Sequence, residues 1–196
     1  MKRFFSMFIA IIVVMGSIVI FASCDTTDTN NEDTKTTTAP QTTTVVTTVP
    51  TPVIPDGYKV YKNDDLSFVY PKTWDVDESN DMLLIRDEDT GNNINLITEP
   101  KHNLYDNLTL EQFNAEYKPV YEQMGMTVTN ASVEHKEVNG IKVVVVSYSA
   151  EMLGVSMKQS QYMLTLGDST YSLTITEMVS DAALALNVLN SLKAVK

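Results

Sequence analysis

Nine residues in the first half of the chain, LSFVYPKTW (residues 66–74), carry most of the information about its architecture. Large apolar side chains alternate with smaller ones in the first five positions, a pattern that predicts a strand with one apolar face. These alternating residues are Leu66, Phe68 and Tyr70. Pro71 cannot donate to a strand ladder and so ends the strand. Trp74 then follows closely enough to fold back onto the edge of the sheet.

Further strand patterns surround this stretch and are separated by turn-forming residues. We expect strands at 58–62, 82–86, 93–98, 126–131, 133–138, 141–150, 156–166 and 171–178. Four consecutive valines, Val143–Val146, predict a central strand that is covered on both faces. The links NDD, DEDTGN and GDST are short enough for hairpins, so the sheet is expected to be largely antiparallel.

Two amphipathic helices complete the pattern. Thr109 and Gln112 form a capping-box signature at the start of the first helix, and Gly125 ends it. Its apolar face would contain Leu110, Phe113, Tyr117, Tyr121 and Met124. Pro119 should kink this helix. We expect Ser180 to cap the second helix, whose apolar face would contain Ala182, Ala185, Leu186, Leu189 and Leu192. Two such helices need a sheet to cover, which predicts an α+β sandwich.

With this order of elements in place, LSFVYPKTW resembles the FSFxYPxxW signature near the start of PsbP-like and DcrB-like domains. Two more segments match: the VNG turn (residues 138–140) before the valine-rich strand, and TYSLTIT followed by a helix ending LNSLK. The resemblance covers roughly residues 57–195 and implies an α/β/α sandwich. It implies little chemistry, because members are generally non-catalytic: accessory subunits of membrane complexes, Ran-binding relatives and lipoproteins of unknown role. No ligand-binding residue of the family maps onto this chain.

The N-terminal residues 1–23 have the three parts of a secretory signal: Lys2 and Arg3, an apolar run, and small residues before Cys24. FASC resembles a bacterial lipobox, with Phe21 where Leu is usual, so Cys24 is the predicted site of lipid attachment. The alternative is an uncleaved membrane anchor, since residues 4–23 are long enough to span ~30 Å of hydrocarbon. Both readings place the rest of the chain on the extracytoplasmic face of a cell membrane.

Residues 24–55 are expected to be a disordered linker, because 13 of the 31 residues after Cys24 are Thr and few are large and apolar. Residues 56–196 form the predicted PsbP-like domain. Cys24 is the only cysteine, so the domain can form no internal disulfide.

The chain has 25 acidic and 14 basic residues, a net charge of −11. No basic stripe is present to neutralise phosphates, so nucleic acid is not an expected partner. The expected partners are the membrane, through the N-terminal lipid, and a protein of the envelope.

Three groups of residues are candidates for chemistry. His102 and His135 are the only histidines; they lack metal-ligand spacing and are interpreted as surface residues. GDST (residues 167–170) resembles the nucleophile segment of some lipases. A serine hydrolase of that kind needs a histidine base after the serine, and no histidine follows Ser169. We therefore interpret GDST as a hairpin turn. The acidic region 75–89 and the adjoining turn to Asn93 offer oxygen ligands, but lack the spacing of a calcium loop. Weak Ca²⁺ binding there is kept as a hypothesis.

The sequence therefore predicts a non-catalytic binding or accessory lipoprotein without a catalytic residue, cofactor or metal site. The alternative is an extracytoplasmic enzyme, or a small-ligand or Ca²⁺ receptor, with a carboxylate-based site.

Overall fold

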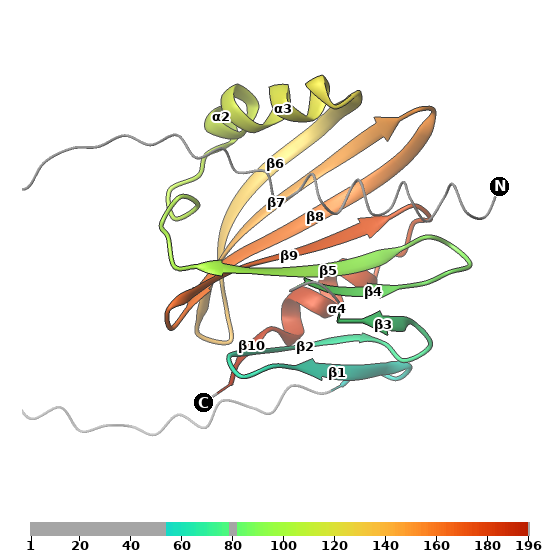
Figure 1. Ribbon diagram of the computed structural model, residues 1–196, viewed down its shortest axis with the longest axis vertical. Coiled ribbons are helices and arrows are strands. Elements are labelled where there is room, and N and C mark those ends of the chain that lie inside the picture. The colour runs from blue at the N-terminus through green and yellow to red at the C-terminus, as the bar shows by residue number, and fades with distance from the viewer. Residues whose placement is uncertain (1–53, 79–81, 196) are drawn as a thin grey trace, which may run out of the picture.

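The computed structural model describes residues 54–78 and 82–195 (Figure 1). The predicted signal peptide, Cys24 and residues 24–53 of the predicted linker therefore lie outside the described residues. Within the described part, no helix has both the length and the apolar character needed to cross a membrane.

The main element is a seven-stranded sheet with the strand order β3-β4-β5-β9-β8-β7-β6. In that order the strands are β3 (Asp75–Asp77), β4 (Met82–Arg86), β5 (Asn93–Pro100), β9 (Ser169–Glu177), β8 (Val155–Leu166), β7 (Ile141–Met152) and β6 (Met126–Val138). A smaller sheet has the order β1-β2-β10, with β1 (Tyr58–Lys62), β2 (Leu66–Pro71) and β10 (Lys193–Ala194). Neighbouring strands pair antiparallel in both sheets, as the short links predict.

Helices lie on both sides of the larger sheet (Figure 1). On one side, α2 (Leu110–Gln112), η1 (Phe113–Tyr117) and α3 (Lys118–Gln123) form one continuous helical segment over β6. On the other side lie α4 (Leu184–Ser191) and the smaller sheet. The expected α/β/α sandwich with an antiparallel sheet is confirmed.

The larger sheet separates two apolar cores. The first core lies on the α4 side and includes all four residues that the opening stretch predicts to be packed: Leu66, Phe68, Tyr70 and Trp74. The second core lies under the α2–α3 segment and is rich in tyrosine and methionine. Val143 and Val145 face the first core, whereas Val144 and Val146 face the second. The predicted burial of β7 on both faces is thus confirmed.

Pro119 is accommodated by a π-helical turn. The capping box of Thr109 and Gln112 begins α2 as predicted. In η1 the backbone N–H of Lys118 donates to the carbonyl of Phe113, five residues earlier. In a regular α-helix the proline ring would clash with the carbonyl four residues before it. The wider turn avoids that clash, and Pro119 then lies in the first turn of α3.

The start of α4 differs from the prediction. Its first residue is Leu184, and Ser180 does not cap it. Instead, Asp181 Oδ1 accepts the backbone N–H groups of Ala183 and Leu184 at 3.1 and 3.2 Å. The predicted apolar face is partly wrong too, because Leu186 is 56% exposed while Leu184 and Val188 are fully buried.

The predicted strands 126–131 and 133–138 are one strand, β6, with a bulge between Thr129 and Ser132. Asn130 at the bulge has a φ of 53°, a left-handed conformation that Asn tolerates better than most residues.

Two hairpin turns of the larger sheet share the same backbone conformation but differ in sequence. The β6–β7 turn has Asn139 at φ 51° and Gly140 at φ 80°. The β7–β8 turn has Leu153 at φ 52° and Gly154 at φ 79°. Positive φ at both central residues is the type I′ pattern, for which Asn-Gly is the preferred sequence. Leu-Gly is therefore an unfavourable choice, and the Leu153 side chain is also 75% exposed.

Candidate functional site

Three rows of polar side chains cross the α4 side of the larger sheet, on strands β6 to β9. The row Thr129, Ser149, Lys158 and Glu177 joins register partners on four neighbouring strands. On one side of it runs the row Thr127, Glu151 and Ser156, and on the other the row Ser132, Ser147 and Ser160. We call these ten residues the hydroxyl grid.

The grid follows from simple alternation along the strands. In β7, Ser147, Ser149 and Glu151 alternate with Tyr148 and Ala150, which pack in the second core. In β8, Ser156, Lys158 and Ser160 alternate with Met157 of the second core and with Gln159, which is buried and bonded to Tyr148 and Thr176. Side chains of a strand point to opposite faces in turn, so one face of each strand carries the grid and the other is buried.

The first two rows line a cavity of ≈ 370 Å³. Ser180 and Met178, from the segment between β9 and α4, complete the wall. Four hydroxyl groups of the grid line the cavity and make no hydrogen bond to another described residue: those of Thr127, Thr129, Ser149 and Ser156. These groups are therefore available to a ligand.

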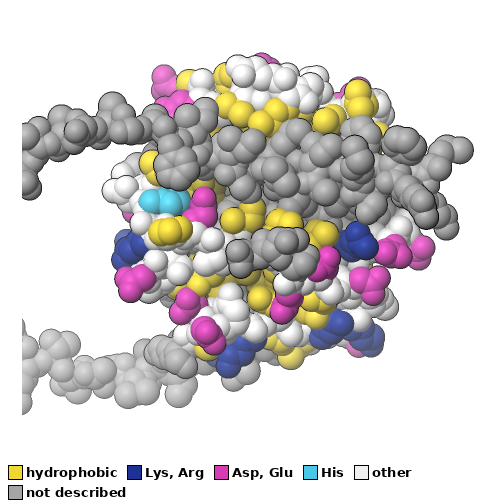
Figure 2. Space-filling model, viewed as in Figure 1, with side chains coloured by type: hydrophobic (Ala, Val, Ile, Leu, Met, Phe, Trp, Pro, Cys, Tyr) yellow, Lys and Arg dark blue, Asp and Glu magenta, His cyan; other side chains and the backbone are white. Residues whose placement is uncertain are grey.

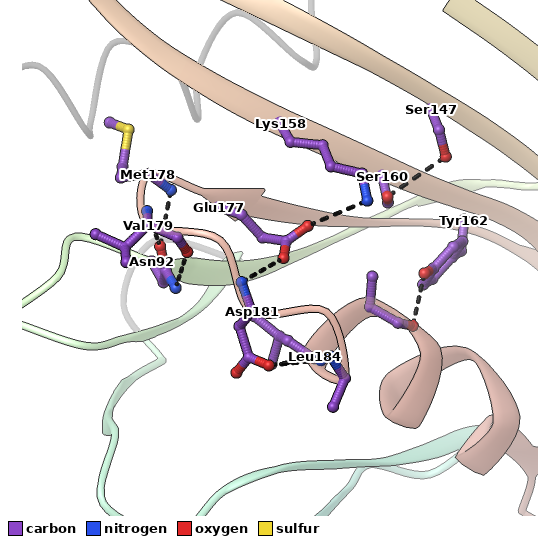
Figure 3. A network of polar contacts seen from close by, with 12 residues as sticks. Asn92, Ser147, Lys158, Ser160, Tyr162, Glu177, Met178, Val179, Asp181 and Leu184 are labelled. Atoms are coloured by element: carbon purple, nitrogen blue, oxygen red, sulfur yellow. Dashed lines mark hydrogen bonds and ion pairs between the residues drawn. The ribbon is translucent and has the colours of Figure 1, made fainter.

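Glu177 is the buried charge of the site, with only 3% of its side chain exposed. Its Oε1 accepts the backbone N–H of Asp181 at 3.1 Å. Its Oε2 lies 3.8 Å from Lys158 Nζ, and the Lys158 side chain is 58% exposed (Figure 3). Burying a carboxylate costs several kcal/mol unless it is paired and hydrogen-bonded. The backbone bond and the ion pair offset that cost and fix the carboxylate at the edge of the cavity.

Asn92 holds the wall of the cavity in place. Its Oδ1 accepts the backbone N–H groups of Met178 and Val179 at 2.7 and 2.9 Å. Its Nδ2 donates to the carbonyl of Val179 at 2.9 Å (Figure 3). Asn92 lies in the turn considered above as a source of oxygen ligands for Ca²⁺. Its amide instead joins the turn after β4 to the segment after β9.

The two histidines line one cavity of ≈ 660 Å³ on the other side of the sheet, together with Tyr105, Thr165 and Thr170. His102 Nε2 lies 3.3 Å from Glu99 Oε2, while its Nδ1 is buried without a partner among the described residues. His135 Nε2 lies 2.8 Å from the carbonyl oxygen of Leu108. His135 is exposed on β6 as predicted, but His102 is only 23% exposed and is not an ordinary surface residue.

The other sequence candidates have structural roles. In GDST, Gly167 and Asp168 connect β8 to β9, and the Thr170 hydroxyl bonds to the backbone N–H and carbonyl of His102 at 3.1 and 3.3 Å. Asp87 closes the turn after β4, accepting the Asp89 backbone N–H at 3.1 Å and the Thr90 hydroxyl at 2.8 Å. Across residues 54–78 and 82–195, no three His, Cys, Asp or Glu side chains are arranged to hold a metal ion.

Charge is distributed without a continuous basic stripe over the described part of the face in Figure 2, where Lys and Arg side chains lie among acidic ones.

Comparisons with known proteins identify the fold. No protein-family model matches the sequence, and no curated protein sequence matches it. The chain is similar to the solution structure of cyanobacterial PsbP (CyanoP) from Synechocystis sp. PCC 6803, with a TM-score of 0.54 and 13% identity. That match covers 76% of this chain and 98% of CyanoP.

Two further similar structures have lower TM-scores. One is a crystal structure from Bacteroides thetaiotaomicron VPI-5482, with a TM-score of 0.47 and 12% identity over 67% of this chain. The match spans 45% of that protein, less than half of its length. The other is LpqN of Mycobacterium tuberculosis, described as involved in cell envelope biogenesis, with a TM-score of 0.38 and 11% identity. It matches over 67% of this chain and 83% of LpqN. The CyanoP match shows a PsbP-like fold and nothing about chemistry.

Proposed function

We propose that this chain is a non-catalytic binding or accessory module, held by a lipid at Cys24 on the extracytoplasmic face of a cell membrane. The hydroxyl grid would be its binding surface. The N-terminal sequence supports the anchor, and the Thr-rich residues 24–55 would act as a stalk between the membrane and the folded domain.

The observation that carries this proposal is the chemical nature of the grid. Seven of its ten residues are Ser or Thr. Their hydroxyl groups donate and accept hydrogen bonds but do not titrate near neutral pH. Acid–base catalysis needs a group whose pKa lies close to the working pH. Rows of hydroxyl groups are suited to holding a ligand.

The rigidity of the grid supports binding as well. Seven of its residues lie in the central strands β7, β8 and β9, and the wall formed by Met178 is fixed by Asn92. A surface that is ordered before it meets its ligand loses less conformational entropy on binding.

The alternative function, an extracytoplasmic enzyme with a carboxylate-based site, has one observation in its favour. Glu151 and Glu177 line the same cavity. Paired carboxylates are the usual machinery of glycoside hydrolysis. However, Glu151 is exposed, and Glu177 is engaged by the Asp181 backbone N–H and by Lys158. We therefore favour a binding role for both.

Two measurements test the proposal. The first is labelling with radioactive palmitate in a bacterial host, comparing the wild-type chain with Cys24→Ala. We expect label on the wild-type protein only. A wild-type chain that takes up no label and still carries Ser23 joined to Cys24 would contradict the lipid anchor and support the plain membrane anchor.

The second measurement places a photo-crosslinking residue at Ser149 in the grid or, as a control, at the exposed Thr98 on β5. We expect a distinct crosslinked species in intact cells from position 149 and not from position 98. Equal crosslinking at both positions, or none at 149, would contradict a binding role for the grid. Turnover of a substrate that is lost in Glu177→Gln would establish the enzyme instead.

A further inference from the structure

We propose that the hydroxyl grid binds a neutral, polyhydroxylated ligand: a glycan chain that lies along the row from Thr129 to Glu177. This inference rests on the proposed function only in taking the grid as a binding surface. It adds the chemical class of the ligand and the residues that select it.

The charges of the cavity favour a neutral ligand. Glu151 and Glu177 contribute two negative charges and Lys158 one positive charge. An anionic ligand would meet a net negative cavity on a chain whose net charge is already −11. A cationic ligand would have to compete for the buried carboxylate with Lys158, whose Nζ already lies 3.8 Å from Glu177 Oε2. A ligand without charge avoids both penalties.

The hydrogen-bonding groups exclude an apolar ligand. An apolar molecule that covered Thr127, Thr129, Ser149 and Ser156 would leave four hydroxyl groups without partners. Each buried polar group left unsatisfied costs about 1–3 kcal/mol. The ligand must therefore supply several donors and acceptors of its own, spread over the whole surface.

Sugar hydroxyl groups match these requirements group by group. A sugar hydroxyl can donate and accept, as can the Ser and Thr hydroxyls that face it. Lys158 can only donate, and the Glu177 carboxylate can only accept. A bond from a sugar hydroxyl to Glu177 Oε2 would be charge-assisted, and such bonds are roughly twice as strong as neutral ones. Oε2 has the Lys158 ion pair but accepts no hydrogen bond from another described residue.

The spacing of the grid suits a chain better than a single small molecule. Neighbouring strands lie about 4.8 Å apart, so the four residues from Thr129 to Glu177 span roughly 14 Å. The parallel row of Thr127, Glu151 and Ser156 lies two residues along the strands, roughly 7 Å away. A ribbon-shaped ligand could contact both rows at once.

The test is isothermal titration calorimetry of the full chain in detergent micelles, with chitotetraose and maltotetraose as probes. Thr129→Val and Ser149→Ala each remove one hydroxyl group and should weaken binding roughly 2- to 10-fold. Glu177→Gln keeps an oxygen for the Asp181 backbone N–H but removes the charge, and should weaken binding at least roughly 10-fold.

Two control substitutions lie outside the cavity. Thr98→Val makes the same change as Thr129→Val at an exposed position of β5, and Glu134→Gln removes an exposed carboxylate on β6. Both should bind the probes like wild type. Circular dichroism of every variant shows whether the fold is intact. Binding to an uncharged ligand should also change little between low and high salt, because no charge pair is screened.

Three outcomes would overturn the glycan assignment: no binding of either probe by the wild-type chain, equal weakening by the control substitutions, or grid variants that fold and bind like wild type. If the Ser149 crosslinker captures a protein while both glycans fail, the ligand class is wrong but the binding module stands. If the glycans bind while palmitate labelling fails, the lipid anchor is wrong but the glycan site stands.

Discussion

Replacing Leu153 by Asn should stabilise the domain. Leu153 occupies the first central position of the β7–β8 turn at a φ of 52°. A left-handed conformation costs an ordinary L-residue about 1–2 kcal/mol, and Asn tolerates it because its short side chain can bond locally. The β6–β7 turn of the same sheet already uses Asn139 at a φ of 51°. The β6–β7 turn thus shows that Asn is accommodated at this position of a hairpin in the same sheet.

The expected gain can be worked out from the exposure of the side chain. Leu153 is 75% exposed, so only about a quarter of its surface is buried. Full burial of a Leu side chain is worth about 1.5–3 kcal/mol, and a quarter of that is about 0.4–0.8 kcal/mol. Subtracting this loss from the relieved strain leaves a net stabilisation of about 0.2–1.6 kcal/mol. In a domain of this size, a gain near the middle of that range raises the melting temperature by roughly 2–4 °C.

The reciprocal substitution, Asn139→Leu, should have the opposite sign and a larger magnitude. It introduces the same strain and also removes two hydrogen bonds, from Asn139 Nδ2 to the carbonyls of Asn190 and Leu192 at 3.0 and 2.8 Å. At about 0.5–1.5 kcal/mol for each bond, the total loss is about 2–5 kcal/mol.

Urea denaturation of the two variants measures both changes. The single tryptophan, Trp74, is 7% exposed and packs in the first core, so its fluorescence reports unfolding. We expect the midpoint to rise for Leu153→Asn and to fall for Asn139→Leu, with the slope of the transition unchanged. A midpoint for Leu153→Asn at or below that of wild type would refute the reasoning. It would mean that the leucine contributes contacts that offset its backbone strain.

Two further substitutions and a rise in pH should each change the stability of the domain in urea denaturation. Tyr148→Phe should destabilise the domain by about 1–3 kcal/mol or more in urea denaturation, because the buried Tyr148 hydroxyl donates to Gln159 Oε1 and accepts from Gln161 Nε2. Thr109→Ala should cost about 1 kcal/mol in the same assay, because it removes the side-chain cap of α2. Burial raises the pKa of Tyr148 and Tyr162 above the ordinary 10.0. Since the unfolded chain ionises first, the urea midpoint should hold below about pH 10 and fall as the pH rises further; an unchanged midpoint there would contradict this.

The sequence predicts the strands well because their signal is local. Alternation is enough to identify β2 and β9, and a continuous β-branched run identifies β7. The short turns between consecutive strands indicate the antiparallel pairing. The start of α4 is harder to predict, because both Ser and Asp accept backbone N–H groups well near the start of a helix. Here Asp181 Oδ1 accepts those of Ala183 and Leu184, and Glu177 Oε1 holds the Asp181 backbone N–H.

The candidate site could also be predicted only in part from local sequence patterns. Alternation marks Ser147, Ser149 and Glu151 as one face of a strand. However, their alignment with residues of three other strands depends on the register of each pairing. A shift of one residue would send the polar side chains to the opposite face. His102 and His135 are 33 positions apart in the sequence, and only the three-dimensional path of the chain brings them to one cavity.

The valine run of β7 has a consequence for how the domain unfolds. Successive valines of β7 pack alternately in the first and the second core, so both cores contain side chains of the same strand. Melting of one core would release β7 and deprive the other core of its central wall. The two cores should therefore open together, as one cooperative unit, despite lying on opposite sides of the sheet. A domain that cannot open by halves exposes few partly unfolded forms to proteases.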